Sequence, residues 1–265
     1  MPLVELCMGL LLGLVLGSFA NVVIHRLPRM LEAQWSEHAP EAKSPYNLAV
    51  PASHCPHCAT PLRWYHNIPL LSFVLLRGRC GSCGTRIGWR YPLVELTAAV
   101  LCAWCFVRYG LSYHALVWSG FSLTLLMLAM IDWDTTLLPD VLTQPLTWGG
   151  LMAASLGWTD LSLETALWGA VAGYLFLWSV YWIFKLVTGK EGMGQGDFKL
   201  LAALGAWLGP WAGVSLILIA SISGLVIGLL LRRQGQLREG LYLPFGPFLS
   251  FAGLWIMIAG PLPGL

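Results

Sequence analysis

Long apolar runs separated by short polar stretches dominate the chain. They occupy Leu3–Ile24, Pro92–Val107, His114–Ile131, Val141–Leu156, Leu163–Val187, Phe198–Gly209, Trp211–Leu231 and Phe245–Ala259. Runs of about 18 or more apolar residues are typical of membrane-spanning helices. The pattern therefore predicts an all-α polytopic membrane protein with about eight transmembrane helices.

The composition agrees with this fold class. Hydrophobic residues make up 57% of the chain, charged residues only 11%, and the mean hydropathy is +0.69. A soluble domain of this size carries roughly twice that share of charge. The first run has Glu5 where a signal peptide has basic residues, and no clear small-residue cleavage site follows it, so we interpret it as a retained span.

A polar interval interrupts the apolar pattern between Arg26 and Arg90. Prolines, histidines, charges and four cysteines fall in these residues, about 65 in all. We therefore predict three parts, namely a first transmembrane helix (1–25), a small extramembrane domain (26–91) and a seven-helix transmembrane region (92–265).

The basic residues indicate the orientation of the spans. Lysine and arginine in short loops favour the cytoplasmic side of a membrane. If the Arg26–Arg90 interval is cytoplasmic, the far side holds Arg108 alone. The cytoplasmic side then holds Arg26, Arg29, Lys43, Arg63, Arg77, Arg79, Arg86, Arg90, Lys185, Lys190, Lys199, Arg232, Arg233 and Arg238. This distribution places both termini outside and the loops after the third and fifth spans in the cytoplasm.

Two Cys-x-x-Cys pairs lie in the polar interval, with 21 residues between them. They are Cys55 with Cys58 and Cys80 with Cys83. Two such pairs supply the four thiolates of a closed, structural zinc site. A domain of this size has a small hydrophobic core, and a bound metal would stabilise it. Two disulfides are the alternative, but the reducing cytoplasm disfavours them.

Other residues near these pairs are less suited to bind the metal. His54 and His57 are possible replacement ligands, although four thiolates fit a zinc site better. Cys102 and Cys105 lie inside an apolar span and Cys7 lies in the first, so we expect these three to pack rather than bind metal.

A glycine-rich stretch, Gly192–Lys199, breaks the apolar pattern between two long runs and contains Asp197. The helix after it, Phe198–Gly209, is 12 residues long and covers only about 18 Å, against about 30 Å of hydrocarbon. Asp197 is thus expected below the membrane surface at the start of a short helix. A carboxylate in that position is costly and indicates function.

A second acid is expected to face Asp197. Asp132 ends the third span, Asp140 opens the fourth and is a possible helix cap, and Asp134 is expected to be exposed in a loop. A close pair of carboxyl groups shares a proton, which suits the base and acid roles of aspartyl peptide hydrolysis. Helix capping, or ion binding in a transporter or scaffold, is the alternative. Glu5 and Glu95 are compatible with structural or substrate-related roles.

Several motifs together resemble the bacterial type IV prepilin leader peptidases, which also process pseudopilins of type II secretion. The motifs are Gly17–Pro28, the two Cys-x-x-Cys pairs, Arg90–Glu95, Ile131–Asp140 and Gly194–Asp197, in this order. The Gly-x-Gly-Asp motif alone is shared with other membrane proteases. The order of all the motifs is what identifies this family.

The resemblance implies an aspartyl endopeptidase of the bacterial inner membrane, with its active site toward the cytoplasm. The catalytic pair of the family maps onto Asp132 and Asp197. Its members cleave prepilins after a glycine, and many methylate the new N-terminus with S-adenosylmethionine; a peptidase without methyl transfer is the alternative. The methyl-donor site is assigned only to the cysteine-bearing domain. We expect prepilin substrates and membrane lipid as partners, and no nucleic acid.

Overall fold

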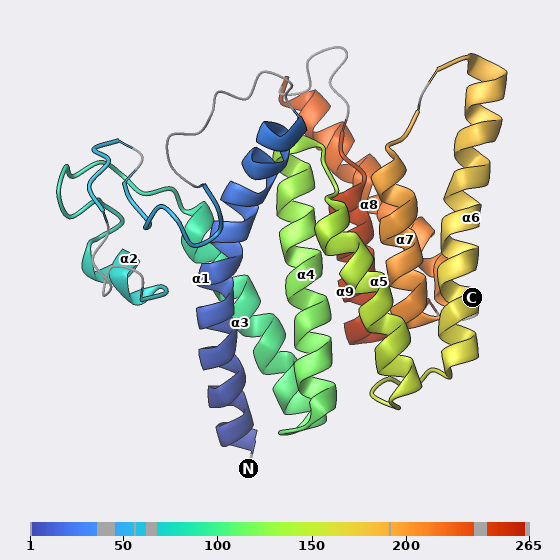
Figure 1. The fold of residues 1–265 in the computed structure, drawn as a ribbon, viewed down its shortest axis with the longest axis horizontal. Coiled ribbons are helices and arrows are strands. Elements are labelled where there is room, and N and C mark those ends of the chain that lie inside the picture. Colours follow the sequence, from blue (N-terminus) through green and yellow to red (C-terminus); the bar gives the residue numbers. More distant parts are fainter. Residues whose placement is uncertain are drawn as a thin grey trace. The chain divides into compact units, whose positions relative to one another are not determined.

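The computed structural model describes residues 2–35, 46–55, 57–61, 68–190, 192–235 and 243–262 (Figure 1). Within these residues the chain forms nine helices and no strand beyond two isolated bridges. The helices are α1 (Pro2–Trp35), α2 (Leu71–Leu75), α3 (Arg90–Tyr109), α4 (Tyr113–Thr135), α5 (Asp140–Ser155), α6 (Leu163–Thr188), α7 (Gln195–Leu208), α8 (Ala212–Arg233) and α9 (Gly246–Ala259). Lys43, Arg63 and Arg238, used above to orient the spans, lie outside the described residues.

Five of the described helices, α1, α3, α4, α6 and α8, are long and apolar enough to cross a membrane. The other three long helices are shorter, with 16 residues in α5 and 14 each in α7 and α9. The eight long helices match the eight apolar runs, and the four cysteines lie between the first two of them. The prediction of an all-α polytopic membrane protein with a cysteine-bearing domain after the first helix is therefore confirmed.

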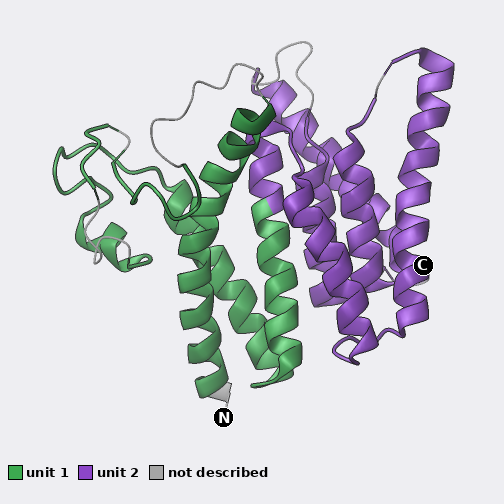
Figure 2. Cartoon of the chain, in the orientation of Figure 1, with its two compact units in different colours: residues 1–127 green, residues 128–265 purple. Residues whose placement is uncertain are grey.

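The chain divides into two compact units, Met1–Met127 and Leu128–Leu265 (Figure 2). The division falls inside α4, so this helix contributes its first part to unit 1 and its last turns to unit 2. Both proposed catalytic aspartates belong to unit 2. The four cysteines of the two Cys-x-x-Cys pairs, each pair called a knuckle below, belong to unit 1. Each site is thus built within one unit.

In unit 1, α1 packs against α3 through small residues. Gly9, Gly13 and Gly17 recur every four residues on α1, and a methyl group at Gly13 would lie 2.5 Å from the Cα of Ala99. Small residues at this spacing allow helix backbones to approach closely in membranes, where burial of apolar surface drives little association. The first helix is also longer than its apolar run, since it continues from Ile24 through Arg26 to Trp35.

Two polar side chains of these helices hold the segments that carry the cysteines. Arg26 is buried and donates to the carbonyl oxygens of Asn47 at 3.0 Å and Pro51 at 2.7 Å. Glu95 accepts the backbone N–H of Leu70 at 2.9 Å. The sequence left a structural and a substrate-related role open for Glu95, and this hydrogen bond supports the structural one. These bonds attach the cysteine domain, defined here as the described residues from Tyr46 to Trp89, to α1 and α3.

In unit 2, α7 is the central helix and is buried along almost its whole length. Its Gly205 backbone touches Gly169 of α6 so closely that neither position has room for a methyl group. On another side, the indole N–H of Trp207 donates to the carbonyl oxygen of Leu146 in α5 at 2.7 Å. These contacts fix the helix that begins at the glycine-rich stretch.

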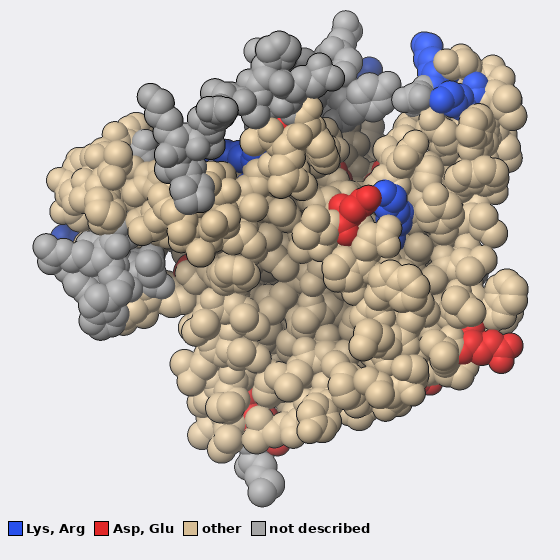
Figure 3. All heavy atoms as spheres, viewed as in Figure 1, with Lys and Arg blue, Asp and Glu red and all other residues tan. Residues whose placement is uncertain are grey.

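Charged side chains are sparse on the sides of the helices. On the face drawn in Figure 3, residues other than Lys, Arg, Asp and Glu cover most of the helical surface. Large apolar side chains are also exposed, among them Leu186 and Val187 of α6 and Leu225 of α8, at 79%, 79% and 63%. Such exposure fits helices that face lipid rather than water.

Candidate active site

Asp132 lies in the last turn of α4 and is buried, with 4% of its surface exposed. Its Oδ2 accepts a hydrogen bond from the backbone N–H of Gly246, the first residue of α9, at 2.9 Å. A methyl group at Gly246 would lie 2.5 Å from this oxygen. Glycine is therefore required where α9 begins, because any other residue would displace the carboxyl group.

Asp197 lies in the first turn of α7 and is also buried, with 7% of its surface exposed. The helix begins after Gly194, whose carbonyl oxygen accepts the N–H of Asp197 at 3.2 Å. The prediction that this acid stands at the start of a short helix is confirmed. The N-terminal end of a helix carries a partial positive charge, which favours a carboxylate there.

The two aspartates come together within unit 2. Their carboxyl groups lie within electrostatic reach of each other although 65 positions separate them in the chain. Leu138, in the loop after α4, lies close to both aspartates. Its side chain is beside Gly196, which precedes Asp197, and beside Gly246, which donates to Asp132. The loop between α4 and α5 thus places one apolar side chain next to the residues that adjoin both aspartates.

The other two acids of this region have different surroundings. Asp134 is exposed and lies in α4, not in a loop as expected. Asp140 does not cap α5, whose N-cap is Pro139 and has no side-chain cap bond. Its carboxylate instead pairs with Lys199, with the Nζ 2.6 Å from Oδ1 and 2.8 Å from Oδ2. The sequence alone had indicated no role at this site for Lys199, Leu138 or Gly246.

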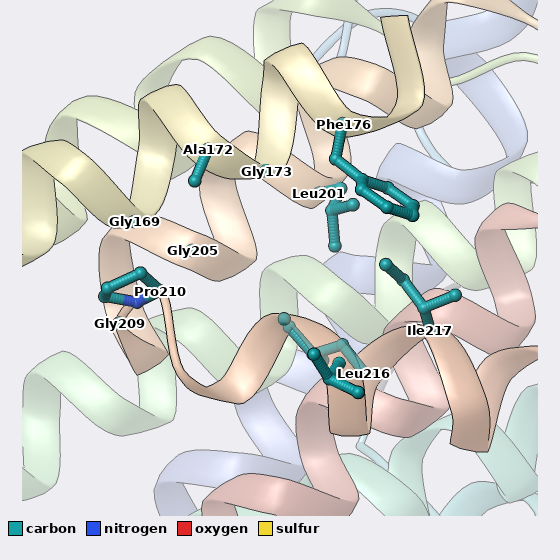
Figure 4. A pocket seen from close by; sticks show the side chains of 12 residues that line it. Gly169, Ala172, Gly173, Phe176, Leu201, Gly205, Gly209, Pro210, Leu216 and Ile217 are labelled. Atoms are coloured by element: carbon teal, nitrogen blue, oxygen red, sulfur yellow. The ribbon is translucent and has the colours of Figure 1, made fainter. Parts of the chain in front are cut away.

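An apolar pocket lies between α6, α7 and α8 (Figure 4). Glycines, Pro210 and aliphatic side chains including Leu201 and Ile217 line it. Neither Asp132 nor Asp197 is among the lining residues. The pocket therefore holds no group that would carry acid–base chemistry.

The four knuckle cysteines form a cluster in unit 1. The Sγ atoms of Cys55, Cys58, Cys80 and Cys83 all lie within 4.8 Å of one another. Cys55 and Cys83 have their Sγ atoms 3.8 Å apart, and none of the four is in a disulfide. A tetrahedral zinc with bonds of about 2.3 Å needs thiolates about 3.8 Å apart, so the donor set fits this metal.

The two knuckles share a longer motif, Cys-x-x-Cys-x-Thr, which sequence reasoning missed. The N–H of Cys55 donates to the carbonyl oxygen of Thr60 at 3.0 Å, and the N–H of Cys80 donates to that of Thr85 at 2.8 Å. The Thr hydroxyls lie 3.2 Å from the Sγ of Cys58 and 3.3 Å from the Sγ of Cys83. The repeated threonine, two positions after the second cysteine of each pair, was a signal available in the sequence.

These threonines favour the thiolate forms that bind metal. The Thr85 hydroxyl, followed by the Thr85 backbone N–H, lowers the pKa of Cys83 to about 6. The Thr60 hydroxyl likewise lowers the pKa of Cys58. Hydrogen bonds to a sulfur stabilise its charged form, so these two ligands lose their protons more readily than a free cysteine.

The remaining candidate ligands lie outside this cluster. The Nδ1 of His54 lies within hydrogen-bond distance of the carbonyl oxygen of Ala52, at 3.1 Å. Neither His54 nor His57 belongs to the cluster of four cysteines. Cys102 and Cys105 are fully buried in α3, as expected for packing residues. Cys7 is exposed on α1, so the expectation that it packs inside the protein was wrong. The apolar run around it does not distinguish a lipid-facing position from a buried one.

Comparison with known proteins separates the same two regions. Residues 11–109 match the bacterial peptidase A24 N-terminal domain, and residues 119–229 match the type IV leader peptidase family. A prepilin leader peptidase/N-methyltransferase of Stutzerimonas stutzeri is 49% identical over 97% of this chain and 91% of its own length. Proteins with the same name from Pseudomonas aeruginosa and Aeromonas hydrophila are each 48% identical, with the same coverage. No solved structure shows significant similarity.

The fold and the two sites define a multi-pass α-helical membrane protein with a cysteine cluster in one unit and a buried aspartate pair in the other. The first matched region contains the four cysteines and the second contains both aspartates. With this similarity along nearly its whole length, the chain belongs to the prepilin leader peptidase/N-methyltransferase family.

Proposed function

We propose that this chain is a membrane aspartyl endopeptidase that removes the leader from type IV prepilins or pseudopilins and then methylates the new N-terminus. The observation that carries the peptidase assignment is the pair of buried carboxyl groups, Asp132 and Asp197, brought together from two helix ends. The names of relatives with about 48% identity supply the substrate class and the second activity.

In this mechanism the two carboxyl groups share one proton. The ionised carboxylate takes a proton from water, and the resulting hydroxide attacks the carbonyl carbon of the scissile bond. The protonated carboxyl donates its proton to the carbonyl oxygen. The tetrahedral intermediate then breaks its C–N bond as the carboxyl group that took the proton from water gives it to the amine nitrogen, and the other carboxylate recovers a proton from the hydroxyl of the intermediate. The Gly246 N–H keeps the Asp132 carboxyl oriented through these steps.

The methyl group comes from S-adenosylmethionine, which supplies an electrophilic methyl on a sulfonium. The neutral amine of the newly exposed N-terminus would attack this methyl carbon as its bond to sulfur breaks, with S-adenosylhomocysteine as the leaving group, and the methylated amine would then lose a proton to solvent. We place this reaction in the region around the cysteine domain and assign no residue to the methyl donor. Zinc held by Cys55, Cys58, Cys80 and Cys83 has a structural role there, because four thiolates leave no open coordination position.

The proposed location is the bacterial inner membrane, with the cysteine domain and the acid pair toward the cytoplasm. The excess of basic residues near these two regions supports this orientation. By role, residues 1–25 form the first transmembrane helix, residues 26–91 the zinc-binding domain and residues 92–265 the protease domain. A prepilin carries its cleavage site next to a hydrophobic helix, so an acid pair near the cytoplasmic side would meet that site at the membrane interface.

The test uses purified full-length protein and a prepilin peptide in membrane mimetic. Asp132→Asn and Asp197→Asn should each reduce cleavage by about 10³-fold or more, within the range expected for lost acid–base chemistry. Asp134→Asn, on the exposed side of the same helix turn, serves as the matched control and should cleave normally. Normal cleavage by either of the first two variants would refute the assignment.

Mass spectrometry of the cleaved product separates the two proposed activities. With S-adenosylmethionine present, the first residue of the mature product should carry one additional methyl group. A cleaved product without this methyl group would retain the peptidase and reject the methyltransferase.

A further inference from the structure

The short helix α2 exposes a continuous apolar face. Leu71, Val74 and Leu75 have 50%, 69% and 71% of their surfaces exposed, and no residue of this helix is buried. Positions i, i+3 and i+4 fall on one side of a helix, so the three side chains form a single patch. Nothing described in unit 1 covers this patch.

The position of α2 is set by a contact with a membrane-spanning helix. Leu70, which precedes α2, donates its N–H to Glu95, five residues after the start of α3. Five residues of helix correspond to about 7.5 Å. The helix α2 therefore lies beside α3 rather than beyond its end, and Figure 1 shows it level with the first half of α3.

Exposed apolar side chains also lie on α3 close to Glu95. Leu93, Leu96 and Val100 on the outer side of α3 are 57%, 48% and 55% exposed, and α3 is apolar enough to cross a membrane. Where α3 crosses a membrane, an apolar patch held beside its first turns lies near the boundary between headgroups and acyl chains. Amphipathic helices bind membranes at this depth.

The orientation of α2 is fixed by contacts on its other side. The ring of Phe73 packs against Trp89 with centroids 5.0 Å apart. The same ring lies close to Gly78, where an added methyl group would be 3.0 Å from it. Since Phe73 is held toward the cysteine domain, Leu71, Val74 and Leu75 are held away from it.

Two basic side chains follow directly after the patch. Arg77 and Arg79 are exposed and lie immediately after α2. Arginine beside an interfacial apolar surface attracts anionic lipid headgroups. The combination of an apolar face and adjacent positive charge favours an anionic bilayer over a basic prepilin leader.

We propose that Leu71, Val74 and Leu75, together with Arg77 and Arg79, form a lipid-docking surface that holds the cysteine domain against an anionic bilayer. The three apolar side chains enter the headgroup–acyl boundary, and the two arginines contact phosphate groups. Glu95 positions this surface through its hydrogen bond to Leu70. This inference concerns the lipid contact alone and does not depend on the proposed peptidase activity.

The test places a photoreactive diazirine amino acid at Val74 or Leu75 of the full-length protein, reconstituted in vesicles of phosphatidylethanolamine and phosphatidylglycerol. Irradiation should give lipid adducts at both positions with a yield similar to that at Leu96 of α3. Ser82, exposed between the second pair of cysteines, is the matched control and should give at least about 5-fold less adduct. Yields at Val74 and Leu75 as low as at Ser82 would overturn the proposal. Adducts to an added prepilin peptide with none to lipid would overturn it too, and would make the patch a substrate surface.

The contribution of the arginines is measured with the same probe at Val74. The adduct yield should fall at least 2-fold when zwitterionic phosphatidylcholine replaces phosphatidylglycerol. Arg77→Gln combined with Arg79→Gln should lower the yield in anionic vesicles to the zwitterionic level. A yield that depends on neither lipid charge nor these arginines would refute their role in docking.

Discussion

The backbone N–H of Gly246 donates to Oδ2 of Asp132 over 2.9 Å and joins two residues that are 114 positions apart. The start of α9 thereby fixes the orientation of a carboxyl group at the end of α4. Because a methyl group at position 246 would lie 2.5 Å from that oxygen, Gly246→Ala must displace the acid. A displacement of about 1 Å at a reacting group costs about 10²-fold in rate, so we expect a loss of peptidase activity of this size.

The measurement for Gly246→Ala is kcat/KM for prepilin peptide cleavage. Gly120→Ala is the matched control, because this glycine of α4 has no atom within 4 Å of an added methyl group. The control should keep full activity. If Gly246→Ala is as active as Gly120→Ala, then α9 does not position the acid.

The ion pair between Asp140 and Lys199 links the starts of α5 and α7. Its side chains are 58% and 30% exposed, and exposed pairs contribute about 0–1 kcal/mol to stability. We expect Lys199→Ala to lower kcat/KM about 3- to 10-fold, with little change in Tm, since Asp197 lies two residues from Lys199. Asp140→Ala should have the same effect.

A charge reversal tests this pair directly. The double variant Asp140→Lys with Lys199→Asp restores opposite charges and should recover most of the activity lost in either single reversal. A double variant no better than the single variants would show that the two charges act separately.

Metal retention should depend on the threonines of the knuckles. Zinc binds the thiolate, and the Thr85 hydroxyl lowers the pKa of Cys83 to about 6. Removal of this hydroxyl raises the pKa, so protons compete with the metal at a higher pH. We therefore expect Thr85→Val to release zinc at a higher pH than the wild-type protein during acid titration.

The release is followed with a zinc-sensitive dye. Ser82→Ala, in the same knuckle, is the control and should leave the midpoint unchanged. A midpoint that moves to lower pH in Thr85→Val, or does not move, would contradict the role given to the hydroxyl.

The stability of unit 2 should depend on the close contact between Gly205 and Gly169. No space for a methyl group exists at either glycine, so Gly205→Ala forces α6 and α7 apart. Overpacking of this kind costs about 1–3 kcal/mol. Thermal unfolding in detergent should show a lower Tm for Gly205→Ala than for Gly149→Ala, where the nearest atom would be at an ordinary 3.6 Å. Equal Tm values for the two variants would mean that α6 and α7 accommodate the added methyl group without loss of stability.

Local patterns made part of this structure predictable. The apolar runs revealed the eight long helices because a span must satisfy its own backbone hydrogen bonds. The spacing of Cys55, Cys58, Cys80 and Cys83 identified the cluster, and the glycines before Asp197 identified the start of α7. In each case the information lies within a few neighbouring residues.

The missed features arise from contacts between distant segments. Gly246 resembles many other glycines in the chain, and only the approach of α9 to α4 makes it important. The extension of α1 to Trp35 is supported by the bonds of Arg26 to a loop more than 20 residues away. Asp140 looked like a helix cap because its partner, Lys199, lies 59 positions further along.

Helices α5, α7 and α9 all begin around the acid pair, and all three are short. Their 14 to 16 residues cover about 21–24 Å, so each falls about 6–9 Å short of the hydrocarbon thickness. If the other ends of these helices reach the far membrane interface, the bilayer is locally thinner at the end where the acid pair lies, and this thinned region is here called a dimple. Hydrolysis consumes water, and the dimple would deliver it. In the proposed mechanism, the length of three helices then governs the supply of the second reactant.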